Sequence, residues 1–312
     1  MYFFSQYKRG IFNKYRKGMP VFEMFTKDCG HMFIMIQNML FHSTKHKKVL
    51  VFPHYPSRGS TLYKILRRLR CTVTNKPSRD FSCAVYWEYL TERKEYAFLE
   101  QCVKTHRVVN LQSRDISKFF VDSVFSEVFG YSTQVNPVEY SGKIVQKSDT
   151  NALHDGVILQ GPLENTDEGS IYQILIDNSL SSELVVDLRV VVVKHIMPFV
   201  YIKYRDISER FQNTTVQTEL KPIEDMLSQV EINLLQVFCD AIYLEYGELD
   251  VLRNNTDGKI YIVDVNNTPQ GPPAHTLPQD AEYALNEIAH AFEREFLMSK
   301  KERTYDKKNT AV

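Results

Sequence analysis

The spacing of apolar residues changes along this chain, and the change predicts two kinds of lobe. Between residues 48 and 112, short apolar runs alternate with helical segments, which is typical of a small parallel α/β lobe. We expect a Pro/Gly/Ser loop at 53–60, a helix at 60–69 and strands at 48–53, 71–74, 83–87 and 107–111. Apolar residues at helical spacing then predict a helix from Asp115 that stops at Gly130.

After Gly130 the pattern favours antiparallel strands. We expect them at 143–147, 157–160, 170–177, 187–193 and 199–205, the last two joined as a hairpin. A period of 3.6 residues predicts an amphipathic helix from Pro222 to Ala241, with the proline in its first turn. A terminal helix is expected from about Asp280 to Ser299.

The segment from Glu248 to Pro269 is the most informative of these elements. Two apolar runs flank Asp257-Gly258, a strong hairpin signal, and Asp250 and Asp264 each lie seven residues from Asp257. If the hairpin is symmetric about that residue, the two carboxylates face each other across neighbouring strands. Asn266 then shares their face, because strand side chains alternate with period two.

Two like charges at roughly 4.5–5.5 Å destabilise a strand ladder. A fold tolerates the pair if a cation lies between them, and two carboxylates with an amide oxygen suit Mg²⁺ held partly by substrate phosphates. The residues therefore favour a magnesium–nucleotide site. The alternative is a solvated hairpin with two unrelated aspartates.

Composition narrows the class of protein. The chain has 312 residues, of which 43% are hydrophobic and 24% charged, as in a soluble globular protein. The chain has five cysteines, an odd number, and none of them form a CxxC pair. This argues against a zinc site or a disulfide framework, and it favours a cytoplasmic protein. The apolar stretch 31–41 is too short to span a bilayer, and no cleavage site follows it.

Charge is unevenly distributed, although the whole chain is neutral. Residues 1–48 hold nine Lys/Arg against Glu23 and Asp28, a net +7, which leaves −7 on the remainder. Aromatic residues interleave with the basic ones, so this extension could contact an anionic membrane surface or pack on its own protein. No nucleic-acid module accompanies it, and we expect no nucleic-acid partner.

Three motifs in order resemble the ATP-grasp superfamily over roughly residues 110–295, with a weaker match at 49–112. Val263-Asp-Val-Asn-Asn-Thr-Pro269 stands where the family has Glu-Val-Asn-x-x-Pro, and Asp187-Leu-Arg189 matches its Asp-Ile-Arg. A strand ending in Lys147 comes upstream of both. The analogues are the ligases that add glutamate to ribosomal proteins, glutathione synthetase and the D-alanine ligases. The resemblance implies four parts: an extension (1–48), a preceding α/β lobe (49–112), an ATP-grasp domain (113–299) and a polar tail (300–312).

The resemblance also implies site residues, position by position. Lys118 and Lys147 correspond to the lysines that contact nucleotide phosphates, and Asp250, Asp264 and Asn266 correspond to the metal ligands. The linker whose backbone would bond adenine is Gln173, Ile174, Leu175 and Ile176. The basic cluster over the transferred phosphate and the acyl group is Arg189, Lys203, Arg205 and Arg210, with Asn213. We expect ATP and two Mg²⁺ ions, for which Mn²⁺ can substitute.

The sequence departs from the family at two places. Asp264 replaces a glutamate, which shortens that ligand by one methylene. The loop 148–156 has one glycine where many relatives have several, so its backbone is less free to wrap a phosphate, and Asn151 or His154 could act there instead.

The activity that these residues favour is ATP-dependent ligation of a small-molecule or peptide carboxylate to an amine. One alternative is an ATP-grasp kinase that phosphorylates a small-molecule hydroxyl, and another is a nucleotide-binding protein without turnover. Two possibilities for the setting stay open: location at the membrane surface and assembly as a homo-oligomer.

Overall fold

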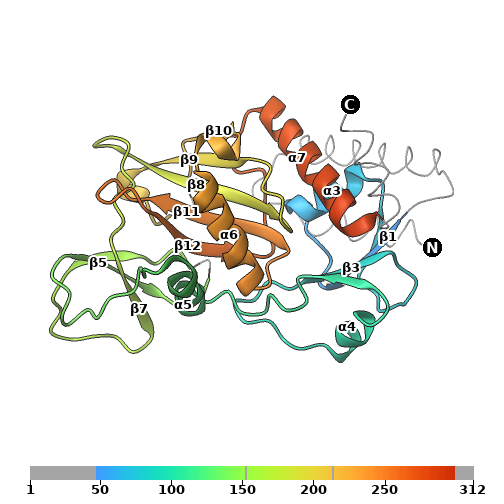
Figure 1. Cartoon of the computed structure of the whole chain (residues 1–312), viewed down its shortest axis with the longest axis horizontal. Coiled ribbons are helices and arrows are strands. Elements are labelled where there is room, and N and C mark those ends of the chain that lie inside the picture. Colours follow the sequence, from blue (N-terminus) through green and yellow to red (C-terminus); the bar gives the residue numbers. More distant parts are fainter. Residues whose placement is uncertain (1–46, 152, 213, 299–312) are drawn as a thin grey trace, which may run out of the picture.

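The computed structural model describes residues 47–298, except residues 152 and 213. Within that part of the chain, a three-stranded and a four-stranded sheet lie at opposite ends of a five-stranded sheet (Figure 1). The fold is the mixed α/β architecture that was predicted, a parallel lobe followed by antiparallel sheets. Nearly all of the basic extension 1–48 and the tail 300–312 lie outside the described residues.

The four-stranded sheet forms the first lobe and is parallel, with strand order β2-β1-β3-β4. Val49, Leu50 and Val51 are fully buried, as expected for a strand covered on both faces. The Ser60 side chain caps α3 by accepting a hydrogen bond from the Tyr63 amide. The elements are β1 (Lys48–Pro53), α3 (Thr61–Arg68), β2 (Thr72–Thr74), β3 (Cys83–Trp87), α4 (Ala97–Cys102) and β4 (Arg107–Val109).

The three-stranded sheet is antiparallel, with order β6-β5-β7, and α5 precedes it in the chain. Ser117 caps the start of α5, and Gly130 ends the helix in the left-handed conformation at φ +77°. The predicted stop at Gly130 is therefore confirmed. The elements are α5 (Lys118–Phe129), β5 (Lys143–Ser148), β6 (Val157–Gln160) and β7 (Ser170–Ile174).

The five-stranded antiparallel sheet has the order β10-β9-β8-β11-β12. Its strands are β8 (Leu184–Val193), β9 (Val200–Asp206), β10 (Gln217–Lys221), β11 (Tyr246–Arg253) and β12 (Ile260–Asn266). The helices are α6 (Gln229–Ala241) and α7 (Pro278–Phe292), with a π turn at Glu293–Leu297 and 3₁₀ turns at Ile207–Glu209 and Ile223–Asp225. No helix in the described part of the chain is long and apolar enough to cross a bilayer.

The two faces of this sheet have different environments. Leu188, Val190 and other residues of one face pack with the buried side chains of α5 and α6, the helices in front of the sheet in Figure 1. Val191 and Val193 of the other face pack with the first lobe and α7. Arg189 lies two residues before Val191 and so shares this second face, where it pairs with Asp250.

The structure corrects several helix boundaries. The helix expected from Asp115 begins at Lys118, after the Ser117 cap, and the terminal helix expected at about 280–299 is α-helical over Pro278–Phe292. The helix predicted from Pro222 begins at Gln229, because Ser228 and Glu231 form a capping box in which each side chain bonds the other's backbone amide. Pro222 leads into a short 3₁₀ turn instead. Helix α4 and strand β10 were not predicted.

Leu235 on α6 is fully buried in the core between this helix and the five-stranded sheet. We expect Leu235→Ala to lower the free energy of unfolding by about 2–5 kcal/mol, because it removes buried contacts and leaves a cavity. Val230→Ala is the matched control, since Val230 lies on the same helix and is 69% exposed. Urea denaturation should place that variant within about 0.5 kcal/mol of wild type. Equal losses would contradict the assignment of the buried face.

Candidate active site

The predicted pair of aspartates forms in the hairpin of β11 and β12. Asp250 is directly opposite Asp264 on β12 and directly opposite Arg189 on β8. The register shifts after Asp250, so that Val251 pairs with Ile262. The hairpin is therefore not symmetric throughout, and a β-bulge brings the aspartates into register.

The negative charge of Asp250 is neutralised by two basic side chains of the protein. Arg189 donates to its two oxygens from Nε and Nη2, at 2.9 and 3.0 Å. Lys203 Nζ lies 3.2 and 3.4 Å from the same two oxygens. Burial alone would raise the pKa of Asp250, but Arg189 and Lys203 hold it far below its ordinary value. The basic cluster and the metal hairpin, which were predicted separately, are thus one hydrogen-bonded unit.

Asp264 has a different environment. Its Oδ1 is buried and accepts no hydrogen bond from a described residue. Burial and the neighbouring Asp250 raise the pKa of Asp264 to about 6, against the lowering influence of Lys118 and Lys147. A buried carboxylate oxygen without a donor is costly, and it marks the point in the hairpin that is suited to a cation.

Two lysines from separate elements approach this carboxylate. Lys118 is the first residue of α5, and its Nζ donates to the Thr150 carbonyl at 2.6 Å. Lys147 lies on β5, where burial and the charge of Lys118 lower its pKa to about 8. Both lysines are close enough to act on the charge of Asp264, as expected where a polyanion is to be held.

Lys203 and Arg205 continue the basic cluster along β9. Arg205 Nε lies 3.0 Å from Asp187 Oδ2, and Asn178 donates to Asp187 Oδ1 at 3.0 Å. Burial raises the pKa of Asp187 against the effect of these cations. Arg210 bonds Asn178 Oδ1 at 2.6 Å, so the predicted basic residues Arg189, Lys203, Arg205 and Arg210 all join one network with Asp187 and Asp250.

The predicted linker lies beside this network. The amides of Ile174 and Leu175 already donate to the carbonyls of Thr133 and Lys143, at 2.8 and 3.1 Å. The buried side chain of Gln173 bonds Thr133 Oγ1, and the Ile176 carbonyl accepts from Arg210 at 2.9 Å. The protein brings the linker to the basic cluster and uses two of its amides internally. Asn213 lies outside the described residues.

The loop 148–156 contacts the hairpin. Asn151 Nδ2 donates to the Val265 carbonyl at 3.1 Å, next to Asp264, and its amide donates to Thr91 Oγ1 at 2.9 Å. His154 adopts a left-handed φ of 55°. Asn151 therefore links this loop to the predicted metal ligands.

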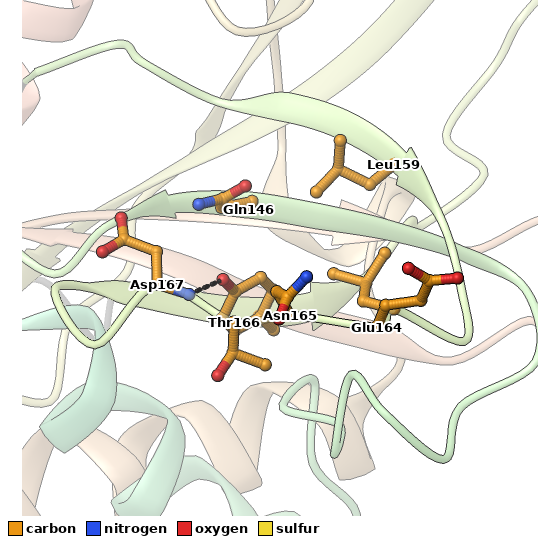
Figure 2. A pocket seen from close by; sticks show the side chains of 8 residues that line it. Gln146, Leu159, Glu164, Asn165, Thr166 and Asp167 are labelled. Carbon is orange, nitrogen blue, oxygen red and sulfur yellow. Dashed lines mark hydrogen bonds between the residues drawn. The ribbon is translucent and has the colours of Figure 1, made fainter.

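A separate hollow of about 490 Å³ lies on the reverse face of the three-stranded sheet. Figure 2 shows Gln146, Leu159 and the loop from Glu164 to Asp167 around it. Gln146 and Lys147 are successive strand residues and point to opposite faces. This hollow is consequently not the place where Lys147 would meet a phosphate.

Glu248 was not predicted as a site residue, although its position two before Asp250 places it on the same face. It is 2% exposed, and its Oε2 accepts no hydrogen bond from a described residue. Arg189 Nη1 is 3.6 Å from that oxygen, too far for a hydrogen bond. Burial raises the pKa of Glu248 to about 7 against the effect of Arg189. Period-two spacing was the available signal for it.

The residues fit a magnesium ion in part. Asp264 offers an unused buried oxygen, and the Asn266 side-chain oxygen accepts from the Thr268 amide at 3.0 Å with a second lone pair left. Asp250 is saturated by its four contacts with Arg189 and Lys203. Among the described residues, no group of three or more His, Cys, Asp or Glu is arranged to hold a metal. Phosphate oxygens would have to complete the coordination.

Comparison with solved structures finds ATP-grasp ligases. PsnB complexed with a minimal precursor aligns at a TM-score of 0.52 with 11% identity, over 79% of this chain and 98% of that chain. The same ligase with minimal precursor, Mg and ADP aligns at 0.51 with 12% identity, over 80% and 98%. D-alanine–D-alanine ligase from Bacillus anthracis, complexed with ATP, aligns at 0.49 with 13% identity, over 78% and 94%. No family model and no curated protein matches the sequence.

This chain therefore has the ATP-grasp fold, as its motifs predicted. The similarity spans 79% of this chain and 98% of PsnB, so it extends over most of the fold.

The Arg189–Asp250 pair generates a stability prediction. Arg189→Met leaves a carboxylate in a largely buried position, and we expect it to cost about 3 kcal/mol of unfolding free energy. Adding Asp250→Asn should restore ~1 kcal/mol or more, because the stranded charge is then removed. Arg294→Met is the control for losing an exposed ion pair, expected at about 0–1 kcal/mol. Strictly additive losses in the double variant would show that the two side chains do not interact.

Proposed function

We propose that this protein is an ATP-dependent ligase that activates a carboxylate as an acyl phosphate and joins it to an amine. The observation that carries the proposal is the buried Oδ1 of Asp264, which has no hydrogen-bond donor among the described residues and feels the charges of Lys118 and Lys147. This arrangement suits a metal-bound polyphosphate, because it combines a hard anionic oxygen with two nearby cations. The ATP-grasp fold supports the same choice.

The reaction has two steps. A carboxylate oxygen attacks the γ-phosphorus of ATP, the bond to the β-phosphate oxygen breaks, and ADP leaves. The amine nitrogen then attacks the acyl carbon, the carbon–oxygen bond to phosphate breaks, and the nitrogen loses a proton. The amide, ADP and phosphate are the products.

Different residues of the chain would bind the phosphates, the adenine and the acyl group. Lys118 and Lys147 hold the phosphates, and the linker 173–176 holds adenine. Asn213 belongs with the basic cluster over the transferred phosphate. Arg189, Lys203, Arg205 and Arg210 form the cationic wall beside the acyl group, where a developing oxyanion is stabilised by a few kcal/mol in typical enzymes. Since Arg189 and Lys203 are already fixed by Asp250, they need little reorganisation during the reaction.

The metal proposal is Mg²⁺ on Asp264 and Asn266. Asp250 would join these ligands only by giving up part of its contacts with Arg189 and Lys203. When bound, the ion would neutralise phosphate charge. Two ions, and Mn²⁺ as a substitute, remain part of the proposal. The structure of PsnB with Mg and ADP supports testing Mg²⁺ with ADP first.

A screen of carboxylates, including peptides, crossed with amines tests the activity by ADP release. We expect turnover to require both an acid and an amine, and Asp264→Asn to lower it at least 100-fold, the range typical for a lost electrostatic group. Asp257→Asn is the control, because Asp257 sits in the turn of the same hairpin and accepts from the Lys259 amide. Normal turnover by Asp264→Asn would refute the metal assignment.

Product analysis separates the ligase from a kinase. Inorganic phosphate in step with amide formation supports ligation. A stable phosphorylated alcohol, formed without an amine, would instead identify phosphoryl transfer to a hydroxyl. Calorimetry that detects no binding of Mg·ATP to the wild-type protein would refute both activities.

A further inference from the structure

Arg93 is a buried cation that none of the proposed steps uses. It lies in the first lobe between β3 and α4, and only 6% of it is exposed. Within residues 47–298, apart from positions 152 and 213, no carboxylate lies within ion-pair distance of its guanidinium. A buried charge without a counter-ion is expensive unless its donors are satisfied.

Backbone carbonyls satisfy this guanidinium. Nε donates to Glu88 O at 3.2 Å, and Nη1 lies 3.3 Å from Tyr86 O and 3.4 Å from Ser113 O. Nη2 donates to Asn267 O at 3.1 Å. The Tyr86 ring lies against the cation, with 5.0 Å from Cζ to the ring centroid. A planar fork of donors can hold several carbonyls at fixed separations, which an ammonium cannot.

The bonded carbonyls belong to segments that lead to the candidate site. Asn267 directly follows Asn266, a predicted metal ligand. Ser113 lies five residues before Lys118, and its carbonyl also accepts from Asn267 Nδ2 at 3.2 Å. Arg93 therefore ties the end of β12 to the start of α5.

The backbone around Arg93 strengthens this junction. The Arg93 amide donates to Arg114 O at 2.7 Å, and the Ile116 amide donates to Thr91 O at 3.0 Å. Between these two bonds, Glu92 and Asp115 form an antiparallel bridge. Thr91 also accepts from Asn151, so the same segment holds the loop that follows Lys147.

We propose that Arg93 is a positioning residue that holds Asn266 and Lys118 at the separation that Mg·nucleotide binding requires. The proposal rests on the proposed function, because the roles of Asn266 and Lys118 belong to it. Arg93 acts through these two residues and touches neither metal nor nucleotide.

The test is the binding of ADP to the full chain, measured by calorimetry with and without Mg²⁺. Arg93→Lys keeps the charge, but its three donors lie on a single nitrogen, so it cannot span the four carbonyls that Nε, Nη1 and Nη2 of the guanidinium bond. We expect the Mg²⁺ concentration for half-maximal ADP binding to rise about tenfold or more, the effect of losing one hydrogen bond to a charged group. The Kd for metal-free ADP should stay within about twofold, because a nucleotide without the metal contacts Lys118 and Lys147 and does not depend on their separation from Asn266.

Arg114→Lys is the matched control, since Arg114 lies in the same junction but pairs with the surface carboxylates of Glu95 and Glu100. It should leave the Mg²⁺ dependence unchanged. If Arg93→Lys does not fold, Asn267→Ala removes the second bond to Ser113 O and should shift the Mg²⁺ dependence in the same direction.

Two results would overturn the inference. One is an unchanged Mg²⁺ dependence in folded Arg93→Lys, or in Asn267→Ala where it replaces that variant. The other is an equal loss of metal-free and Mg²⁺-dependent binding, which indicates general loosening. Failure of the proposed function has a different signature: wild-type protein binds Mg·ADP normally, yet no acid and amine pair releases ADP.

Discussion

The candidate site depends on the hydrogen-bonded ion pairs that Arg189 and Lys203 form with Asp250. Asp250 faces Asp264 across a strand pair, and the ladder could not hold two unscreened carboxylates in a buried sheet face. Arg189 and Lys203 neutralise Asp250, whereas the buried Asp264 remains available to bind a cation. The same contacts hold both basic side chains in place within the protein, so the face that we propose as catalytic is preorganised by the sheet itself.

Local patterns predicted much of this. The Asp257-Gly258 turn with period-two spacing was enough to place Asp250, Asp264 and Asn266 together, and the alternation of strands and helices was enough for the parallel first lobe. Both signals lie within a few residues of what they specify. Helix α6 was misplaced at its start because Pro222 was taken as its first turn, whereas Ser228 and Glu231 supply the cap.

The other parts of the site depend on contacts between distant segments. Arg189 reaches Asp250 across 61 residues, and no local spacing encodes that strand pairing. Arg93 lies in a loop without periodicity, and its role emerges only once the carbonyls of Ser113 and Asn267 are brought together. Glu248 could have been found, because it repeats the two-residue spacing of its own strand.

The bulge in the hairpin separates two parts of the strand pair. Beyond it, the strands run toward a six-residue connection, from 254 to 259, with their register offset by one. On the inner side, β8 independently fixes β11 through the pairing of Arg189 with Asp250. The position of Asp250 is therefore set by the neighbouring strand as well as by the hairpin, and the bulge absorbs the one-residue offset between the connection and the paired aspartates.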